Sequence, residues 1–348
     1  MHKLKEISIR GFRGIKSLRV DGLHSVNVFL GNNNCGKSST LEALMIMLGA
    51  ANPVLPLRMN LDRDYNKVGK DDIKLFFYNL DFSSPVDISG VFDDGAKREL
   101  EIRYFESAER NMPISDNREV GSLHDSGEYG LRYGYRDDGR DMVSTLTVGS
   151  QGVNVNASDN SSSSGKAAFV APRYNFNDSI KNFNEIVTDK EKDQVLEILK
   201  YMEPAVRDVT VVGDKVMVDI GLDKLMPINV LGDGTRKLFT LLTAMYSVKG
   251  GILIIDEVDN GLYYKTMSVL WSALLKASRT LDVQLFVSTH SLDSLNALNR
   301  ELSGDDLADM RGNVGLLTLR RAAEGTVSAN RYDYEKFNYV LGMEVEIR

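Results

Sequence analysis

Cysteine, tryptophan and long apolar runs are scarce in this sequence. Cys35 is the single cysteine, which excludes an internal disulfide framework and favours a reducing compartment. No apolar run approaches the roughly 18 residues that a membrane-spanning helix needs, and the N-terminal residues lack the apolar core of a signal peptide. These absences predict a cytoplasmic protein that makes no membrane contact.

A large excess of charge of either sign is also missing. The 348 residues carry a formal net charge of −7, with 43% hydrophobic and 26% charged residues. This composition is typical of a globular chain that buries a core, and the length allows one large domain or two ordinary ones. The mild acidity argues against a surface that binds nucleic acid throughout, but it is compatible with a local basic patch.

The first part of the chain, up to residue 70, contains a strand, a glycine-rich turn and a helix. The pattern at residues 4–9 alternates as a strand does, and residues 18–20 fit its hairpin partner. A fully apolar strand is predicted at residues 26–30, and a helix at residues 37–48 with Gly49 as its C-terminal cap. Such an order is the context that a phosphate-binding loop requires.

The rest of the chain divides into a β-rich part, a helical part and a second α/β part. Residues 71–170 hold strand-like segments between polar turns, which predicts a mainly antiparallel lobe. Residues 171–205 have helical periodicity that is broken near Thr188, whose hydroxyl could cap the second helix. Residues 206–348 alternate between helix and strand, which predicts a mainly parallel sheet covered by helices. The predicted strands lie at residues 73–82, 100–105, 129–135 and 144–148 in the lobe, and at 252–256 and 283–289 in the last part.

The glycine-rich turn matches the pattern G-x-x-x-x-G-K-[ST] in full. Its glycines allow successive N–H groups to point inward, and the N-terminus of the next helix favours an anion. Lys37 is expected to reach the β- and γ-phosphates, and the Ser38 hydroxyl to bind Mg²⁺. The predicted nucleotide-binding residues are Gly31, Asn32, Asn33, Asn34, Cys35, Gly36, Lys37, Ser38 and Ser39.

Two carboxylates follow the aliphatic run at residues 252–255. The carboxyl ends of parallel strands face the ligand crevice, so Asp256 is expected to hold the Mg²⁺ hydration shell. Glu257 would then polarise the attacking water as a general base. His290 follows the next predicted strand and is expected at the same edge, where it could sense the γ-phosphate or orient the water.

A second glycine-containing segment precedes a predicted helix. Gly234 permits close approach of a backbone, and the N–H groups after it could bind another phosphate. On its own, the segment is more typical of a plain glycine turn in which Asp233 caps the helix.

In this order, the motifs resemble the ATPase head of the ABC superfamily, in the branch that contains RecF, SMC proteins and the OLD (overcoming lysogenization defect) ATPases. ISIRGFRGIKSLRV and FLGNNNCGKSSTLEAL resemble the opening strands and phosphate loop of the OLD-like group, and LGDGTRKLF resembles its signature motif. GGILIIDEVDNGLYY and VQLFVSTHSLDSLNAL resemble its Walker B, D-loop and H-loop segments. The resemblance covers residues 1–60 and 170–348. It implies one ABC-type P-loop head over residues 1–348, with an antiparallel β-rich lobe and a helical insert.

The resemblance also assigns roles to residues. It makes Lys37, Glu257 and His290 the catalytic set, with Glu257 as the base and His290 as the switch histidine. It makes Ser38 and Asp256 the Mg²⁺ ligands, and it implies ATP as the nucleotide.

The resemblance further implies an assembly. In such heads the signature segment caps the ATP held by a second subunit, so a head-to-tail homodimer with shared ATP sites is expected, or a higher oligomer. The implied signature is Leu231, Gly232, Asp233, Gly234 and Thr235, and the implied D-loop that crosses the interface is Asn260, Gly261 and Leu262.

Three positions depart from the family pattern. The signature L-S-G-G-Q becomes L-G-D-G-T, so contact with the γ-phosphate would rest on backbone N–H groups and on Arg236 or Lys237. No glutamine follows the first helix closely, and Asn79 or Asp81 is the candidate replacement for the Q-loop glutamine. Tyr263 stands where the OLD-like group often has histidine.

The sequence therefore predicts a Mg-dependent ATPase that acts as a nucleotide-driven switch. The OLD-like resemblance implies an anti-phage role in which the ATPase controls a separate nuclease or toxin, because the chain ends at Arg348 without room for the Toprim nuclease domain of full OLD proteins. Two alternatives remain open: a RecF-like repair ATPase that clamps DNA, and a scaffold that binds ATP with negligible turnover.

Overall fold

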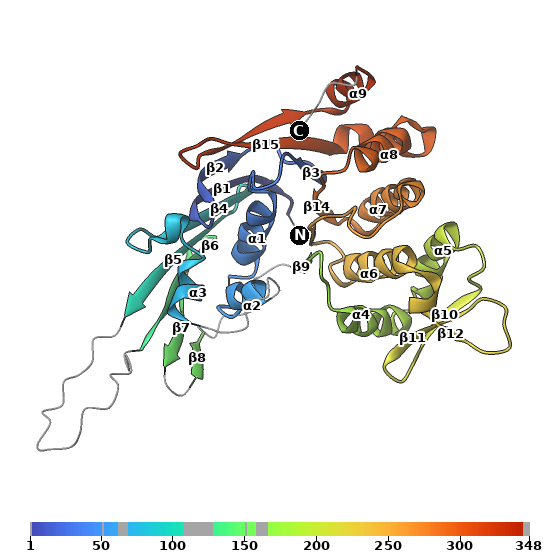
Figure 1. The fold of residues 1–348 in the computed structure, drawn as a ribbon, viewed down its shortest axis with the longest axis horizontal. Coiled ribbons are helices and arrows are strands. Elements are labelled where there is room, and N and C mark those ends of the chain that lie inside the picture. The colour runs from blue at the N-terminus through green and yellow to red at the C-terminus, as the bar shows by residue number, and fades with distance from the viewer. Residues whose placement is uncertain are drawn as a thin grey trace, which may run out of the picture.

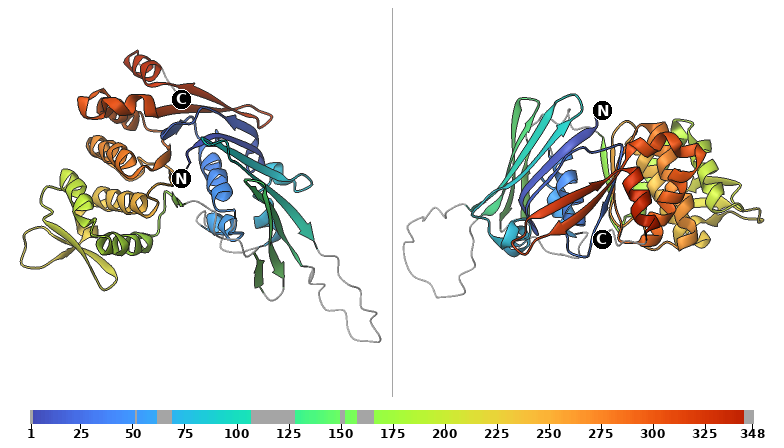
Figure 2. Two further views of the ribbon diagram at one scale, coloured as in Figure 1. Left: turned by 180° about the vertical axis from the view of Figure 1, so that it is seen from behind. Right: turned by 90° about the horizontal axis from the view of Figure 1, so that it is seen from above.

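The computed structural model describes residues 2–50, 52–61, 69–106, 128–149, 152–157 and 166–343. They form a six-stranded sheet at the centre of the molecule, a seven-stranded antiparallel sheet on one side of it and a layer of helices on the other (Figure 1). The view from above shows the same three layers, with the central sheet between the antiparallel lobe and the helices (Figure 2).

The central sheet has the strand order β16-β15-β3-β14-β13-β9, in which only β16 runs antiparallel to its neighbour. Each strand of its parallel core is apolar over most of its length because both faces are covered. Its strands are β3 (Val26–Leu30), β9 (Ala167–Val170), β13 (Ile252–Ile255), β14 (Gln284–Ser288), β15 (Val314–Arg321) and β16 (Val327–Tyr332).

Two hydrophobic cores lie on the two faces of this sheet. Side chains alternate along β3, so Val28 and Leu30 join the core under the helices, whereas Phe29 joins the core toward the antiparallel lobe. The helices on the first face are α6 (Asp233–Ser247), α7 (Met267–Leu281) and α8 (Leu292–Ser303), with α9 (Tyr334–Gly342) beside β15 and β16.

Helix α1 (Lys37–Leu48) lies between the two sheets, where it contacts β14 of one and β1 and β4 of the other (Figure 1). The predicted bounds of this helix and its cap are confirmed, since the Gly49 N–H donates to the Met45 carbonyl at 2.9 Å. The lobe strands are β1 (Leu4–Phe12), β2 (Ile15–Val20), β4 (Val86–Phe92), β5 (Lys97–Glu106), β6 (Tyr129–Asp137), β7 (Arg140–Gly149) and β8 (Gly152–Asn156).

The helical insert consists of α4 (Phe176–Thr188) and α5 (Lys192–Met202), followed by a small sheet. The predicted break near Thr188 is confirmed, but the predicted cap is wrong. The Thr188 hydroxyl donates to the Asn184 carbonyl at 2.8 Å, so it closes α4, and α5 begins after Glu191. The small sheet contains β10 (Asp208–Val212), β11 (Lys215–Asp219) and β12 (Met226–Pro227).

The predicted strand at residues 73–82 is also wrong. This stretch contains the end of α3 (Lys70–Lys74) and the short helix η1 (Tyr78–Leu80), and it follows α2 (Leu55–Leu61) along the described chain. Phe76 and Phe77 are both fully buried, which an extended strand on a one-sided core cannot achieve because consecutive side chains point to opposite faces. A tight turn buries both, and it leads into Asn79 and Leu80 with φ of 57° and 59°.

The N-terminal strand is joined to the central sheet by a side chain. The Gln284 amide nitrogen donates to the Leu4 carbonyl, and the Leu4 N–H donates to the Gln284 amide oxygen, each at 2.8 Å. Leu4 pairs with Phe92 of β4 on one side, and the buried amide takes the place of β2 on the other, because the pairing with β2 reaches only Ile7. It fixes the antiparallel lobe against β14.

Candidate active site

The phosphate loop connects β3 to α1 through two glycines with positive φ. Gly31 has φ of 133°, and a Cβ there would lie 2.5 Å from the Leu319 carbonyl oxygen and 2.7 Å from Cys35 Sγ. Gly36, at the start of α1, has φ of 108°. Only glycine adopts both conformations without strain, so the spacing of the two glycines shapes the loop.

The N-terminus of α1 is prepared for an anion. No side chain caps it and no acidic residue lies in its first turn, so its N–H groups and its dipole meet no negative charge of their own. Thr40 instead donates from its hydroxyl to the Gly36 carbonyl at 2.8 Å, which strengthens the turn.

Lys37 holds the loop from the inside. Its Nζ donates to the Gly31 carbonyl at 2.7 Å and to the Asn32 carbonyl at 3.0 Å. The remaining donor faces Cys35 Sγ at 3.9 Å, a weak acceptor that a phosphate oxygen would readily replace. The buried Cys35 packs against Gly31 and acts as a small filler of the loop.

A cleft of about 790 Å³ brings most of the predicted phosphate-loop residues together with Glu257 and His290. Glu257 and His290 line it from the ends of β13 and β14, and Arg13, Asn79 and Arg321 line it from the lobe and β15. The phosphate-loop residues in this cleft are Asn33, Asn34, Gly36, Lys37, Ser38 and Ser39. Asn32 and Cys35 line a neighbouring hollow of about 660 Å³ with residues 319–323, and Gly31 is buried.

Ser288 connects the Asp256 carboxylate to the backbone of Glu257. Its hydroxyl donates to Asp256 Oδ1 at 2.5 Å and accepts from the Glu257 N–H at 2.8 Å. Asp256 is almost fully buried, and the serine fixes its carboxylate without neutralising it. Glu257 has φ of 51°, a left-handed conformation that is uncommon for a residue with a side chain.

His290 lies at the edge of the cleft with its side chain 52% exposed. Its Nδ1 is 3.8 Å from Asp259 Oδ2, and the other Asp259 oxygen accepts from the Thr289 hydroxyl at 2.5 Å. At this separation Asp259 is a charged neighbour of the imidazole and makes no hydrogen bond to it.

Lys237 reaches the same turn from α6. It is 5% exposed, and its Nζ donates to the Glu257 carbonyl at 3.0 Å and to the Asn260 carbonyl at 2.7 Å. Burial lowers the pKa of Lys237 to about 8, against the opposing attraction of Asp259 and Glu257. Lys237 is thus turned away from the surface where a phosphate contact was expected.

The signature and D-loop residues do not line the cleft. Gly232, Asp233, Asn260 and Gly261 are exposed, and Gly232 rather than Asp233 precedes α6, without a side-chain cap. A Cβ on Gly234 would lie 3.4 Å from Leu262, so the two predicted segments are neighbours on the surface.

The structure separates the two candidates for the missing glutamine. Asn79 lines the cleft, whereas Asp81 Oδ1 accepts from the Ser83 N–H at 2.9 Å and closes a turn. The hydrogen bonds from Ser83 lower the pKa of Asp81, which is consistent with a carboxylate engaged in the fold.

Replacing Asn79 with alanine is expected to reduce nucleotide turnover about 10-fold or more, because one polar group that can orient water or metal in the cleft is lost. Replacing Asp81 with alanine is expected to leave turnover within about 2-fold while removing the bond to Ser83. Phosphate release by both purified variants tests this difference. Equal effects would contradict the assignment to Asn79.

Sequence reasoning missed several side chains of this site. Ser288 lies two positions before His290, and Asp259 lies two positions after Glu257. This closeness in the sequence to two predicted site residues was a signal that could have identified them. Lys237 gave a weaker signal, a lysine on the apolar side of a predicted helix. Arg13 gave none, because the glycine that follows it marks only a turn, yet its Nε pairs with Glu42 Oε2 at 2.8 Å on the lobe side of the cleft.

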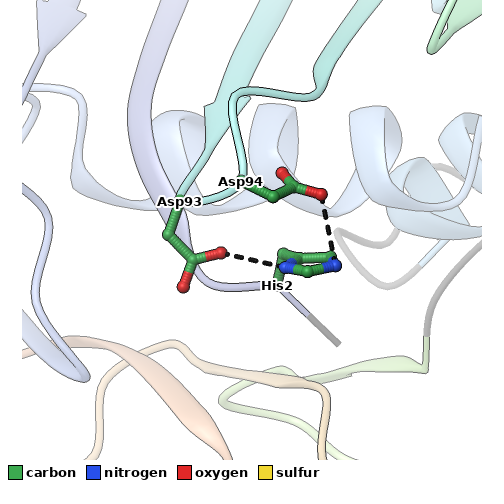
Figure 3. Close-up of side chains that lie close together, drawn as sticks. All are labelled: His2, Asp93 and Asp94. Atoms are coloured by element: carbon green, nitrogen blue, oxygen red, sulfur yellow. Dashed lines mark ion pairs between the residues drawn. The ribbon is translucent and has the colours of Figure 1, made fainter.

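Another group of metal-ligating side chains lies at the start of the chain, outside the cleft (Figure 3). His2 Nδ1 is 3.3 Å from Asp93 and His2 Nε2 is 3.2 Å from Asp94. Each ring nitrogen of His2 faces a different carboxylate, and a single ion cannot bind both nitrogens of one ring. All three side chains are exposed. The arrangement fits a surface ion pair, and we do not assign Mg²⁺ to it.

Solved structures of SMC heads share this fold. The SmcHead bound to the C-winged helix domain of ScpA aligns with a TM-score of 0.51 and 13% identity, over 96% of this chain and 99% of that chain. The Smc head domain with an extended coiled coil, derived from Pyrococcus furiosus, aligns with a TM-score of 0.52 and 11% identity, over 99% and 100%. The predicted fold class, an ABC-type α/β head with an antiparallel lobe, is confirmed. Among the described helices, none has both the length and the apolarity needed to span a bilayer.

Two of the sequence relatives are named for a nucleotide phosphatase activity and for DNA replication and repair. The ATP/GTP phosphatase of Helicobacter pylori is 21% identical over 337 residues, which cover 88% of this chain and 90% of that protein. The DNA replication and repair protein RecF of Oenococcus oeni is 33% identical over 127 residues, 35% of this chain and 30% of that protein. A family model described as "AAA domain, putative AbiEii toxin, Type IV TA system" matches residues 26–296. Because this match covers most of the chain, including the phosphate loop, Glu257 and His290, the protein belongs to that AAA-domain family.

Proposed function

We propose that this protein is a Mg-dependent ATPase that closes head-to-tail around ATP and acts as a nucleotide-driven switch. The observation that carries the proposal is the single cleft lined by Lys37 and Ser38 on one side and by Glu257 and His290 on the other. A phosphate anchor, a carboxylate base and a histidine meet there at the ends of three adjacent parallel strands. The Helicobacter relative, named an ATP/GTP phosphatase, supports the same activity.

Mg²⁺ fits the donors at this site. The Ser38 hydroxyl and the Asp256 carboxylate would hold the ion or its waters, and such oxygen ligands suit a hard cation. The bound ion would neutralise charge that develops on the phosphates. Glu257 would take a proton from the attacking water, and Lys37 and the α1 N-terminus would hold the phosphate chain in place.

A second copy of the chain would complete the site. Gly232 and Asp233 of the signature segment and Asn260 and Gly261 of the predicted D-loop are exposed, whereas Thr235 is buried. Both segments lie outside the cleft of their own chain, as segments that act on a partner's nucleotide must. Arg236 and the α6 N–H groups would supply the γ-phosphate contact, since Lys237 is directed inward. The resulting interface would be twofold symmetric and would bury two ATP molecules.

The proposed biological setting is a conflict system of the cytoplasm in which this ATPase controls a separate nuclease or toxin. The support is the description of its family, which names a toxin of a type IV toxin–antitoxin system, and the OLD-like motifs of the sequence. The OLD-like assignment itself belongs to this proposal.

Phosphate release and molar mass test the function together. The purified protein with Mg·ATP is expected to release phosphate and to shift from monomer to dimer in light scattering, and EDTA is expected to abolish the release. Assembly without any phosphate release would leave a nucleotide-gated scaffold. If the protein neither assembled nor released phosphate, the proposal would be contradicted.

Clamping of DNA is the second candidate, favoured by the relative named RecF. The lobe gives it less support, because arginines on its strands are paired with carboxylates, as Arg103 is with Glu101 and Arg136 with Asp141. ATP-dependent retention on duplex DNA that weakens steeply with salt would favour this candidate.

A further inference from the structure

Lys237 is the buried lysine of α6 that reaches the turn after β13. Its Nζ donates to the Glu257 and Asn260 carbonyls. These two residues are the first and last of one turn, since the Asn260 N–H donates to the Glu257 carbonyl at 3.0 Å. The ammonium therefore holds both ends of the turn that carries Glu257.

The backbone of Glu257 is held from both sides. Ser288 accepts its N–H, and Lys237 donates to its carbonyl. Such restraint is required because φ of 51° is an unfavourable conformation for a residue with a side chain, which persists only where the surroundings enforce it. The direction of the Glu257 carboxylate depends on this conformation.

The location of Lys237 also connects Glu257 to the N-terminal end of α6. The helix that carries it begins after Gly232, in the exposed segment that the proposed function places against the ATP of a second copy. Lys237 lies about one turn further along the same helix, on its buried side. A displacement of the α6 N-terminus would thus be transmitted to Glu257 by one rigid element.

We propose that Lys237 is a positioning residue: it fixes the Glu257 carboxylate where it can take a proton from the water that attacks the γ-phosphate, and it ties that carboxylate to the helix that meets the second nucleotide. The inference rests on the proposed ATPase function. Lys237 touches neither nucleotide nor water in this role, so its loss acts through the turn from Glu257 to Asn260.

Lys237→Met keeps the apolar stem of the side chain up to the ε position but removes its donors. The expected result is a fall in kcat of about 10- to 100-fold, because a general base displaced by about 1 Å loses that much. The Kd for a fluorescent ATP analogue is expected to change less than about 3-fold, since the phosphate loop is untouched. A Kd that weakens in parallel with kcat, or a kcat equal to that of the wild type, would overturn the proposal.

Hydrogen exchange without nucleotide supplies a readout that does not depend on turnover. Peptides covering residues 256–262 of Lys237→Met are expected to exchange faster than in the wild type, and peptides covering residues 31–40 to exchange at the same rate. Unchanged exchange at residues 256–262 would overturn the proposal even if ATP hydrolysis were absent. Missing hydrolysis in the wild type would contradict only the proposed function.

Two further variants separate positioning from general stability. Thr240→Val removes a hydroxyl of the same helix that donates to the Arg236 carbonyl and bonds Ser179, so it is expected to lower thermal stability but leave kcat unchanged. Lys237→Gln is polar but shorter by one bond, and it replaces the methionine variant if that variant does not fold. It is expected to show the same fall in kcat, and a wild-type kcat for this variant would also overturn the proposal.

Discussion

Glu257→Gln is expected to lower phosphate release by about 10²- to 10⁴-fold while ATP still binds. Glutamine has the shape of glutamate but cannot accept the proton of the attacking water. The backbone contacts from Ser288 and Lys237 do not involve the side chain, so the left-handed turn should persist. Rapid mixing with ATP and a phosphate sensor measures the effect.

The same variant should accumulate as an ATP-bound dimer, because closure no longer leads to hydrolysis. Light scattering with ATP is expected to show a larger dimer fraction for Glu257→Gln than for the wild type. Glu197→Gln, an exposed change on α5, is the matched control and should behave as the wild type in both measurements. Phosphate release at the wild-type rate by Glu257→Gln would rule out Glu257 as the base.

Lys37→Met is expected to weaken ATP binding by about 100-fold or more, since a charge-assisted contact to phosphate is worth roughly 1.5 to 3 kcal/mol and the loop loses its own support as well. That support is the pair of bonds from Lys37 to the Gly31 and Asn32 carbonyls. Titration with a fluorescent nucleotide measures the loss, and neither phosphate release nor dimer formation should remain.

Lys200→Met, an exposed change on α5, is the control for lost positive charge. The two catalytic-site variants should differ in kind, because Glu257→Gln retains ATP and Lys37→Met does not. If Lys37→Met bound ATP with wild-type affinity, the glycine-rich loop would not be the phosphate site, and the proposed function would fail with it.

Local sequence patterns predicted the structure correctly where it is determined by one helix or strand and the turn next to it. Gly31 and Gly36 at fixed spacing, an apolar strand before them and helical periodicity after them predicted the loop and the bounds of α1. The apolar runs at β13 and β14 predicted where Glu257 and His290 emerge. In a parallel sheet these strand ends meet at one edge, so their convergence on Lys37 also followed from the sequence.

Local sequence patterns failed where contacts between residues far apart in the sequence determine the structure. Residues 167–170 were predicted as part of the lobe, yet β9 pairs with β13, and nothing in its four residues distinguishes the two sheets. Phe76 and Phe77 suggested a strand because the tight turn that buries both has no local signature. Lys237 was predicted only as a candidate for the γ-phosphate contact, and the packing of α6 against the turn after β13 reveals its acceptors.

The strand order has a consequence for synthesis on the ribosome. Strand β3 is made early, but both of its neighbours, β14 and β15, lie near the other end of the chain. Leu4 and its partner Gln284 are 280 positions apart, which corresponds to roughly 15 to 55 s of translation at usual rates. During that interval the apolar segment VNVFL, and the phosphate loop that it supports, have no sheet to join. The newly made chain should therefore depend on chaperones until β14 and β15 emerge, and it should gain the ability to bind nucleotide only after both strands have been made.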